Sequence, residues 1–496
     1  MPIAWTPLPY QLDAVKFMLT RACGALFLDP GMRKTSITLA YLKTLFGKGL
    51  IKKVLIIAPL RPCYDVWPSE IRKWADFDHL SFQVLHGPGR DARLQTPSQI
   101  YIINPEGLEW LLGATKSKVD RSYVNRFTGQ SGVSKKTKMT VNVKAFAQLG
   151  FDVLIVDELT MFKNTSSNRY KLIKEIIPTF TRRWGLTGSP AANNLLDLFG
   201  QCFVLDQGRT LGRFVTHYRK EYFDSDYNGV VWTIKPDGAE RIYERLEPLA
   251  LRLDNSLLAG LPELIAHVIR VDLPDKARRI YDDLERDMIT LIESRSVIAS
   301  NAASVSSKCR QVASGGLYFT PPPVPGQPAK PREVIQLHDA KTEALQELVE
   351  GLQGQPLLVA YAFEHDLDRL RAAFPHATFA ADVQPAQFSQ LSARWNAGKI
   401  PLLFGHPQSI GHGLNLQEAG QHVCWYSLLW DGELHDQFNR RVLRSGNTSK
   451  HVFIHYLLGR DTIDEMVYGV LQGKEHTQQA LFAGLLRLAR KEPVLC

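Results

Sequence analysis

Short apolar runs, largely of β-branched residues, alternate with helical stretches through the N-terminal part of the chain, and this alternation most limits the possible fold. The runs lie at residues 25–28, 54–58, 99–103, 153–156 and 183–186. Such unbroken apolar runs are typical of strands buried on both faces of a parallel sheet. We therefore predict an α/β fold with helices on the faces of a parallel sheet.

A second region of the same kind follows a proline-rich segment. Residues 320–331, with the sequence TPPPVPGQPAKP, contain six prolines, which exclude a helix or a central strand and predict a loop or semi-rigid linker. Beyond this segment the alternation returns, with strands predicted at residues 356–360, 402–404, 422–425 and 452–456.

The stretch before the proline-rich segment has helical periodicity, most clearly at residues 276–298. The sequence therefore predicts three parts. These are an N-terminal α/β lobe at residues 1–205, a mainly helical insert with its linker at 206–332, and a C-terminal α/β lobe at 333–496.

The composition is that of a globular protein, with 45% apolar and 22% charged residues, and it excludes disorder throughout, collagen and coiled coil. The net charge of +9 favours a polyanionic partner such as nucleic acid, although a basic enzyme without such a partner stays open. Residues 115–144 hold a local charge of +7 and are predicted to form a flexible basic loop. This loop is either simply solvated or grips phosphate through lysines such as Lys135, Lys136 and Lys138.

Neither a membrane segment nor a metal framework is indicated. No apolar run approaches the roughly 20 residues that span a bilayer, so we expect no membrane partner. The six cysteines are scattered without a C-x-x-C pair, which argues against a zinc site and against a disulfide framework. The expected compartment is a reducing cytoplasm.

A phosphate-binding loop is indicated by the sequence LDPGMRKT at residues 28–35, between a predicted strand and a predicted helix. In such a loop Gly31 permits the turn, Lys34 reaches the phosphate oxygens and the Thr35 hydroxyl holds Mg²⁺. The standard pattern has glycine immediately before the lysine, and here Arg33 stands in its place. Taken alone, the match is weak.

The sequence LIVDE at residues 154–158 strengthens this interpretation. Asp157 comes at the end of a predicted strand, where its carboxylate can hold Mg²⁺ through water, and Glu158 beside it can polarise an attacking water. Either motif alone is also compatible with an ordinary turn. Both together, in this order, predict a nucleotide-hydrolysing site.

A pair of arginines near the C-terminus could complete that site. Arg441 and Arg444 lie three residues apart, so on a helix they would share one face. A surface charge stripe is one interpretation. The functional one is a pair of arginine fingers that reach the γ-phosphate from the second lobe.

With these motifs in place, the sequence resembles a superfamily 2 helicase-type ATPase, most closely a Swi/Snf-like DNA translocase of the compact kind found in phages and bacteria. The resemblance implies two RecA-like lobes, ATP and Mg²⁺ as cofactors, and Gln11 of the sequence PYQ as the residue that reads adenine. It also implies that APLR at residues 58–61 touches the DNA backbone through Pro59 and Arg61. The sequence LTGSP at residues 186–190 resembles the motif that couples hydrolysis to nucleic-acid contact through Thr187 and Ser189.

The second lobe carries the remaining motifs of the resemblance. SIGHGLNLQEA at residues 409–419 implies a nucleotide contact at Gly413 and a DNA contact at Asn415. QFNRRVLR at residues 437–444 implies a nucleotide contact at Gln437, with Arg441 and Arg444 as the fingers. Stretches at residues 251–273 and 310–315 resemble the segment that joins the two lobes.

The resemblance implies an ATP-dependent motor on duplex or branched DNA, monomeric, in a bacterial cell and compatible with a phage origin. A replication or recombination protein is a candidate partner. Two other functions stay open: a strand-separating DNA or RNA helicase, and a nucleic-acid-binding protein whose ATPase is impaired by Arg33.

Overall fold

The computed structural model describes residues 2–29, 31–124, 131–188, 190, 195–226, 232–253, 262–293, 299–319, 333–384, 387–410, 414–444 and 447–472. For residues 116–124, 131–138, 287–293 and 299–304 it describes the backbone alone. The chain divides into two compact units, Met1–Leu258 and Ala259–Cys496. The proline-rich linker lies outside the described residues.

The first unit is built on a seven-stranded sheet in which every neighbouring pair is parallel. Its strand order is β11 (Ala250–Leu253), β1 (Cys23–Leu28), β8 (Arg182–Thr187), β7 (Val153–Asp157), β2 (Val54–Ile57), β4 (Ile100–Ile103) and β3 (Phe82–Val84). All four residues of β2 and of β4 are buried, as expected for strands covered on both faces. The predicted α/β fold is confirmed.

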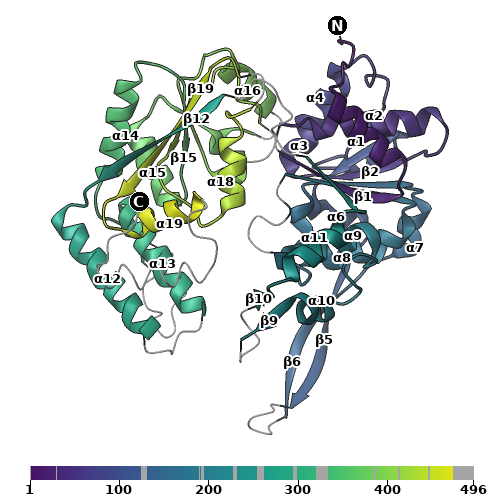
Figure 1. Ribbon diagram of the computed structural model, residues 1–496, viewed down its shortest axis with the longest axis horizontal. Helices are drawn as coiled ribbons and strands as arrows, with labels where there is room; N and C mark the ends of the chain where they lie inside the picture. Colours follow the sequence, from purple (N-terminus) through teal and green to yellow (C-terminus); the bar gives the residue numbers. More distant parts are fainter. Residues whose placement is uncertain are drawn as a thin grey trace. The chain divides into compact units, whose positions relative to one another are not determined.

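Helices cover both faces of this sheet (Figure 1). Alternate strand residues such as Phe27, Ile57 and Val156 form one core with α6 (Leu108–Leu111), α7 (Val143–Gln148), α8 (Asn168–Ile176) and α9 (Leu198–Asp206). The opposite face is covered by α1 (Pro9–Leu19), α2 (Lys34–Gly47) and α4 (Val66–Lys73), beside the short helix α3 (Leu60–Tyr64). The carboxyl ends of the strands therefore meet at one edge, where α/β sheets bind ligands.

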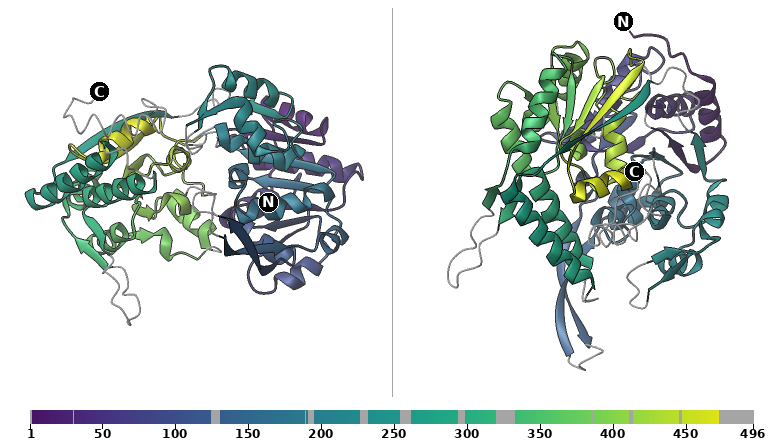
Figure 2. Two further views of the ribbon diagram at one scale, coloured as in Figure 1. Left: turned by 90° about the horizontal axis from the view of Figure 1, so that it is seen from below. Right: turned by 60° about the vertical axis from the view of Figure 1, so that its left-hand side comes forward.

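The basic segment is not the flexible loop that its composition predicted. Its described residues form an antiparallel hairpin of β5 (Thr115–Val124) and β6 (Ser131–Thr140), paired only with each other. Figure 1 and the right-hand view of Figure 2 show both strands extending past the helices of the first unit. A smaller hairpin, β9 (Phe223–Ser225) with β10 (Trp232–Ile234), lies between α10 (Val215–Tyr222) and α11 (Gly238–Leu246) along the chain.

The second unit has a six-stranded parallel sheet. Its order is β12 (Glu263–Val271), β19 (His451–Gly459), β18 (His422–Trp425), β15 (Leu357–Ala360), β17 (Leu402–Gly405) and β16 (Thr378–Phe379). One face packs on α14 (Ala340–Gly351) and α15 (Glu364–Ala373). The other packs on a set that includes α13 (Ala299–Ser314), α16 (Phe388–Asn396), α18 (Gly432–Asn439) and α19 (Ile463–Leu471). The short helix α17 (Pro407–Ile410) follows β17, and the hairpin of β13 (Gly316–Phe319) and β14 (Glu333–Gln336) precedes α14.

The predicted insert at residues 206–332 differs from the structure, because its described residues form no separate unit. β11 extends the first sheet beside β1, whereas β12 extends the second beside β19. The predicted long helix is present as α12 (Asp275–Glu293), and the Tyr281 hydroxyl on it accepts a 2.6 Å hydrogen bond from the Ile463 N–H. The helical periodicity was visible in the sequence, but the two edge strands were not. β12 is largely exposed, and His267 and Arg270 interrupt its apolar residues, so it lacks the unbroken apolar run of a central strand.

Among the described residues, none of the helices combines the length and the apolar character that crossing a bilayer requires.

Candidate nucleotide and DNA site

The loop predicted to bind phosphate runs from the end of β1 into α2. The Lys34 ammonium donates hydrogen bonds to the carbonyl of Leu28, at 2.6 Å, and to that of Asp29, at 3.5 Å. In the described part of the chain no side chain caps the start of α2, so its first N–H groups can face an anion. Thr35 is the second residue of this helix. The loop thus combines an ammonium, a hydroxyl and a helix N-terminus, which together suit phosphate.

Two loop residues have left-handed backbone. Gly31 has φ 96°, a conformation that glycine favours. Arg33 has φ 52° and ψ 41°, so it follows a path that the glycine of the standard pattern would adopt more easily. Next to it, the Tyr10 hydroxyl donates to the Met32 carbonyl at 3.3 Å. Burial raises the pKa of Tyr10, and the nearby positive charge of Arg33 opposes that rise. The turn therefore forms despite the arginine.

Glu158 follows the last residue of β7 and also has left-handed backbone, with φ 71°. Its N–H donates to the Leu186 carbonyl of β8 at 2.9 Å. Its Oε1 accepts hydrogen bonds from the hydroxyls of Thr160, at 3.0 Å, and Thr187, at 2.7 Å. These bonds orient the carboxylate toward neighbours on two segments, which suits a group that must position one water.

Thr187 ends β8, the strand between β1 and β7. The register places it beside Phe27 of β1, and places Asp157 beside Leu186 of β8. The phosphate loop, the Asp157–Glu158 pair and Thr187 thus lie at the ends of three adjacent strands. Thr187 was predicted to contact DNA, but its side chain is fully buried and bound to Glu158. The geometry links it to the Glu158 carboxylate instead.

Asp157 is oriented by a tryptophan. The Nε1–H of Trp67, a fully buried residue on α4, donates to Asp157 Oδ2 at 2.9 Å. The carboxylate of Asp157 and the hydroxyl of Thr35 are hard oxygen donors, as Mg²⁺ prefers. This donor set fits the metal that the sequence predicts.

Gln11, predicted to read adenine, is fully buried on α1. Its Nε2 donates to the Ser36 hydroxyl at 3.2 Å, and its Oε1 accepts the Leu8 N–H at 2.9 Å. The Ser36 hydroxyl in turn donates to the Arg33 carbonyl at 3.0 Å. Gln11 therefore connects α1 to the phosphate loop, and its contact with adenine stays a prediction.

The predicted DNA contacts of the first unit lie in two places. Pro59 precedes α3 and Arg61 lies on it, directly after β2 and at the same edge as the nucleotide motifs. Lys135, Lys136 and Lys138 lie on β6 of the hairpin. Ser189 lies outside the described residues.

In the second unit, the segments predicted to carry nucleotide and DNA contacts are joined. The Arg444 Nη1 donates to Asn415 Oδ1 at 2.6 Å, and the Arg441 Nη1 donates to the Leu414 carbonyl at 3.3 Å. The Leu416 N–H returns a bond to the Arg441 carbonyl at 3.3 Å. The helix predicted to carry both arginines ends at Asn439, so they lie in the turn after α18. Contacts with the 414–416 segment orient both, and the Arg441 Nε also donates to the Gln437 carbonyl of α18 at 3.0 Å.

Gln437 is buried on α18, where its Nε2 donates to Glu433 Oε1 at 3.1 Å. Its Oε1 is buried without a hydrogen-bond partner among the described residues. A bound nucleotide could satisfy such an oxygen. Gly413, the other predicted nucleotide contact of this unit, lies outside the described residues.

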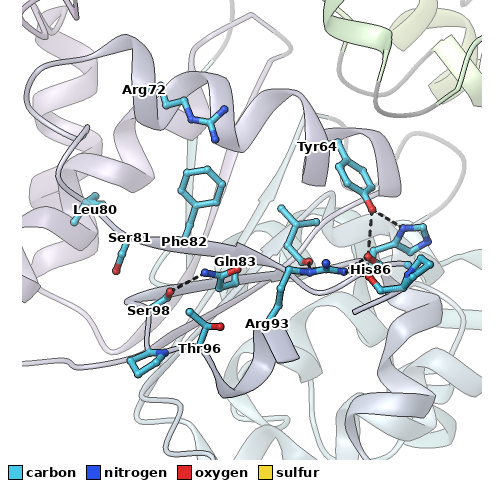
Figure 3. A pocket seen from close by; sticks show the side chains of 14 residues that line it. Tyr64, Arg72, Leu80, Ser81, Phe82, Gln83, His86, Arg93, Thr96 and Ser98 are labelled. Carbon is cyan, nitrogen blue, oxygen red and sulfur yellow. Dashed lines mark hydrogen bonds between the residues drawn. The ribbon is translucent and has the colours of Figure 1, made fainter. Parts of the chain in front are cut away.

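A pocket of about 780 Å³ lies elsewhere, at the outer edge of the first sheet beside β3 (Figure 3). Within it, the Tyr64 hydroxyl lies 2.8 Å from His86 Nδ1. Arg93, on α5 (Arg90–Gln95), donates to the carbonyls of Val84 and His86. Arg93 therefore covers carbonyl groups at the edge of the sheet, which protects it from pairing with another strand. β3 is far from β1 in the strand order, so this pocket is separate from the phosphate loop.

Sequence reasoning missed three residues that shape the site, namely Tyr10, Trp67 and Thr160. Tyr10 stands beside Gln11 in the sequence PYQ, and Thr160 lies two positions after Glu158, but neither was assigned a role. Trp67 follows the segment at residues 58–61, and the same resemblance connects it only with the contact to the DNA backbone. Its hydrogen bond to Asp157 joins residues 90 positions apart, so no local sequence pattern predicts it.

Three comparisons place the chain among known proteins. A profile of the SNF2-related domain matches residues 10–314. The chain is 32% identical to putative protein p41 of Acyrthosiphon pisum secondary endosymbiont phage 1, covering 97% of this chain and 99% of that protein. It is 25% identical to an uncharacterized ATP-dependent helicase of Mycoplasma genitalium, covering 94% of this chain and 41% of that one.

A further relative is the DNA annealing helicase and endonuclease ZRANB3 of Bos taurus, 25% identical over 94% of this chain and 40% of that protein. The chain thus spans nearly the whole phage protein but less than half of either helicase. The profile covers more than half of the chain, and the match to the phage protein is end to end. The chain therefore belongs to the SNF2-related family, the Swi/Snf-like ATPases of helicase superfamily 2.

Proposed function

We propose that this chain hydrolyses ATP and uses the cycle to move along, or to remodel, duplex or branched DNA. The observation that carries the proposal is the arrangement around Glu158. Its carboxylate is fixed by the hydroxyls of Thr160 and Thr187. One strand, β8, lies between β7, which Glu158 follows, and β1, which leads into the loop that holds Lys34. Membership of the SNF2-related family supports ATP as the nucleotide.

In the first unit, the Lys34 ammonium and the start of α2 bind the phosphates, and Glu158 orients the attacking water and accepts its proton. Gly31 gives the loop its turn, and Gln11 reads adenine. When bound with ATP, Mg²⁺ would be held by Thr35 and Asp157 and would neutralise charge on the phosphate oxygens. Trp67 keeps the Asp157 carboxylate oriented.

The second unit contributes Arg441 and Arg444 to the γ-phosphate, with Gly413 and Gln437 as further nucleotide contacts. Asn415 holds the Arg444 guanidinium at 2.6 Å and is also the proposed DNA contact of this unit. A contact between Asn415 and DNA would then change the position of Arg444. In the first unit, the buried Thr187 positions the Glu158 carboxylate and does not itself contact DNA.

The grip on DNA is proposed to act on the phosphate backbone, through Pro59, Arg61, Ser189 and the basic hairpin. Backbone contacts carry no sequence information, and their strength falls as salt rises. If the two units grip alternately as nucleotide binds and leaves, cycles of hydrolysis become steps along the duplex.

A triplex-displacement assay tests this proposal. A third strand bound to a long duplex is released only when a motor travels through it. We expect release that depends on ATP and disappears in Glu158→Gln, which keeps the size of the side chain but cannot accept the proton. Intact triplex under conditions in which the protein binds the duplex and hydrolyses ATP would contradict translocation.

The assay also separates the alternatives. Unwinding of a forked duplex without triplex release would identify a strand-separating helicase. Binding without hydrolysis would identify an impaired ATPase. The structure offers little support for the latter, because Arg33 adopts left-handed backbone and the turn still forms.

A further inference from the structure

The β5–β6 hairpin has no structural role in the sheet of the first unit. Its strands pair with each other over ten residues and with no other described strand. Figure 1 and the right-hand view of Figure 2 show it projecting from the unit. An isolated two-stranded hairpin is at best marginally stable in water, so a projecting ribbon of this length is better explained by a partner than by packing.

The base of the hairpin is nevertheless fixed to the unit. The hydroxyls of Thr115 and Thr140, at its two ends, are hydrogen-bonded at 3.0 Å. Met139 and Val141 pack against the core of the first unit. The Asn142 N–H donates to the Leu112 carbonyl at 3.2 Å. The base of the ribbon is therefore anchored to the unit that holds the phosphate loop.

The register divides the charges of the ribbon unequally between its faces. Side chains alternate along a strand, and directly opposed residues share a face. Lys136 is opposite Val119, Lys138 opposite Ser117 and Arg121 opposite Ser134, so these three basic positions lie on one face, which we call the basic face. The register assigns no acidic residue to it.

The other face also carries three lysines but is partly neutralised. Lys116, Lys118 and Lys135 belong to it, and Asp120 is directly opposite Lys135. Opposite charges at such a position attract one another. Lys135, predicted together with Lys136 and Lys138 as a DNA contact, thus belongs to the less basic face.

The dimensions of the ribbon match duplex DNA. Ten residues at about 3.4 Å each span roughly 34 Å, which is about one helical turn of B-DNA. A two-stranded ribbon also fits the major groove, which is about 12 Å wide. A rigid duplex presents phosphates along the whole of this length. A flexible single strand offers no such fixed array.

We propose that the basic face of the β5–β6 ribbon, with Arg121, Lys136 and Lys138, docks on the phosphate backbone of duplex DNA. These three positions lie at the levels of residues 121, 119 and 117, so they span roughly 14 Å of the ribbon. This inference rests on the proposed function and names the class of DNA that the first unit holds. The ribbon gives an extended grip, independent of sequence, at a distance from the nucleotide motifs.

The two faces supply a matched pair of variants. Lys136→Gln with Lys138→Gln removes two charges from the basic face. Lys116→Gln with Lys118→Gln removes two from the other face, over the same stretch of the ribbon. Total charge and composition change equally in both, so the variants differ only in the face and in the strand that carries it.

Binding of a labelled 40-base-pair duplex is measured by fluorescence anisotropy at several salt concentrations. Each lost phosphate contact lowers the slope of log affinity against log salt by about 0.9. For the basic-face variant we expect this slope to be smaller than the parent's by about 1.8. Between 50 and 200 mM salt, the factor by which affinity falls is then about twelve times smaller for the variant than for the parent. We expect nearly the parent slope for the other variant. Equal slopes in both variants, whether reduced or unchanged, would overturn the assignment of the face.

A shortened hairpin tests the ribbon as a whole. Replacing residues 119–136 by Asn-Gly keeps the pairing near the base and closes it with a tight turn. We expect hydrolysis without DNA to be unchanged and the duplex concentration for half-maximal stimulation to rise at least tenfold. An unchanged duplex requirement, or an equal loss of single-strand affinity, would refute the ribbon as a duplex grip. Failure of the proposed function is distinguishable, because the parent itself would then show no stimulation by duplex.

Discussion

Two residues of the nucleotide site hold a backbone conformation that is costly for residues other than glycine. Arg33 has φ 52° and Glu158 has φ 71°. Left-handed backbone destabilises a residue with a Cβ by about 1–2 kcal/mol, and such residues are frequent at functional sites. The Glu158 N–H is held by the Leu186 carbonyl at 2.9 Å, and its carboxylate is held by two hydroxyls. The strained backbone of Glu158 is thus found together with a carboxylate that is held in one orientation.

The bond between Thr187 and Glu158 gives the first prediction. Thr187→Val removes the 2.7 Å donor but keeps the volume of a fully buried side chain. The Glu158 carboxylate then loses one of its two positioning hydroxyls, so we expect kcat for ATP hydrolysis to fall about 10- to 100-fold. Thr187→Ser keeps the hydroxyl and serves as the control, with kcat close to that of the parent. Equal kcat values for the valine and serine variants would contradict the positioning role.

Arg33 gives the second prediction, in which backbone and charge are separated by two variants. Both Arg33→Gly and Arg33→Ala remove the exposed guanidinium, but only glycine relieves the left-handed backbone. We expect the free energy of unfolding of the alanine variant to lie about 0.5–1 kcal/mol below that of the glycine variant. Urea unfolding measures this difference.

ATP turnover should survive in both Arg33 variants if the arginine is merely tolerated in the loop. A large loss of turnover in both would show instead that the guanidinium contacts phosphate. Steady-state hydrolysis over a range of ATP concentrations distinguishes these outcomes.

At the scale of elements, the 414–416 segment and the turn after α18 act as one piece. The bond from Arg444 to Asn415 and the bonds between Arg441 and Leu414 and Leu416 link them. Arg441 is also held by α18, because its Nε donates to the Gln437 carbonyl at 3.0 Å. The position of the second unit's charges therefore depends on a segment that was predicted to contact DNA.

The third prediction concerns this link. Arg444→Ala should leave nucleotide binding intact and reduce the rate of hydrolysis at least a few hundred-fold, as loss of an arginine finger does. Asn415→Ala removes only the 2.6 Å acceptor that orients Arg444, so we expect a smaller loss, of about tenfold. Single-turnover hydrolysis and equilibrium binding of nucleotide separate the two effects. An Arg444→Ala rate equal to that of the parent would disprove the finger.

Three neighbouring strands of the second sheet carry a chain of histidines. His267 Nδ1 lies 3.1 Å from His455 Nδ1, and His455 Nε2 lies 3.1 Å from His422 Nδ1. His422 Nε2 lies 2.9 Å from Gln355 Oε1, an acceptor. If each ring donates once toward Gln355, every contact is satisfied with all three rings neutral. A proton added at His455 Nδ1 would require His267 to carry its own proton on Nε2, so that its Nδ1 can accept.

The fourth prediction is the pH dependence of stability. Burial, reinforced by the neighbouring histidines, lowers the pKa of His455 to about 4, against about 6.5 in an unfolded chain. The unfolded state therefore binds the proton first as pH falls. The free energy of unfolding should be full above about pH 6.5 and decrease between pH 6.5 and 4, by up to about 1.4 kcal/mol per pH unit for this residue.

Urea unfolding between pH 4 and 7 measures this effect. We expect His455→Gln to have a shallower decrease with falling pH than the parent. The control His376→Gln changes an exposed histidine and should keep the parent's slope. Identical slopes for His455→Gln and the parent would exclude His455 as the source.

The central strands could be predicted from the sequence, because an unbroken apolar run such as residues 54–57 is itself the local signal of a strand buried on both faces. It did not reveal β12, whose largely exposed residues become a strand only by pairing with β19. The hairpin was mistaken for a loop because its polar, lysine-rich residues lack the apolar alternation of a half-buried strand. In the site, the loop and strand-end acids were predictable, whereas Trp67 and the Asn415–Arg444 bond depend on tertiary contacts.

At the scale of the whole molecule, the chain consists of two α/β units, each with its own parallel sheet and its own share of the residues proposed to act on the nucleotide. The first holds the phosphate loop and the acids, and the second holds the arginines. The basic hairpin belongs to the first unit. This distribution suits an ATPase whose hydrolysis depends on what its units bind.

Steady-state ATP hydrolysis tests the central claim most directly, measured without nucleic acid and then with duplex DNA, single-stranded DNA or RNA. The account predicts strong stimulation by duplex DNA and clearly weaker stimulation by the other two. Stimulation by single strands or RNA alone would contradict a duplex motor. So would the absence of hydrolysis under every condition while duplex DNA is still bound.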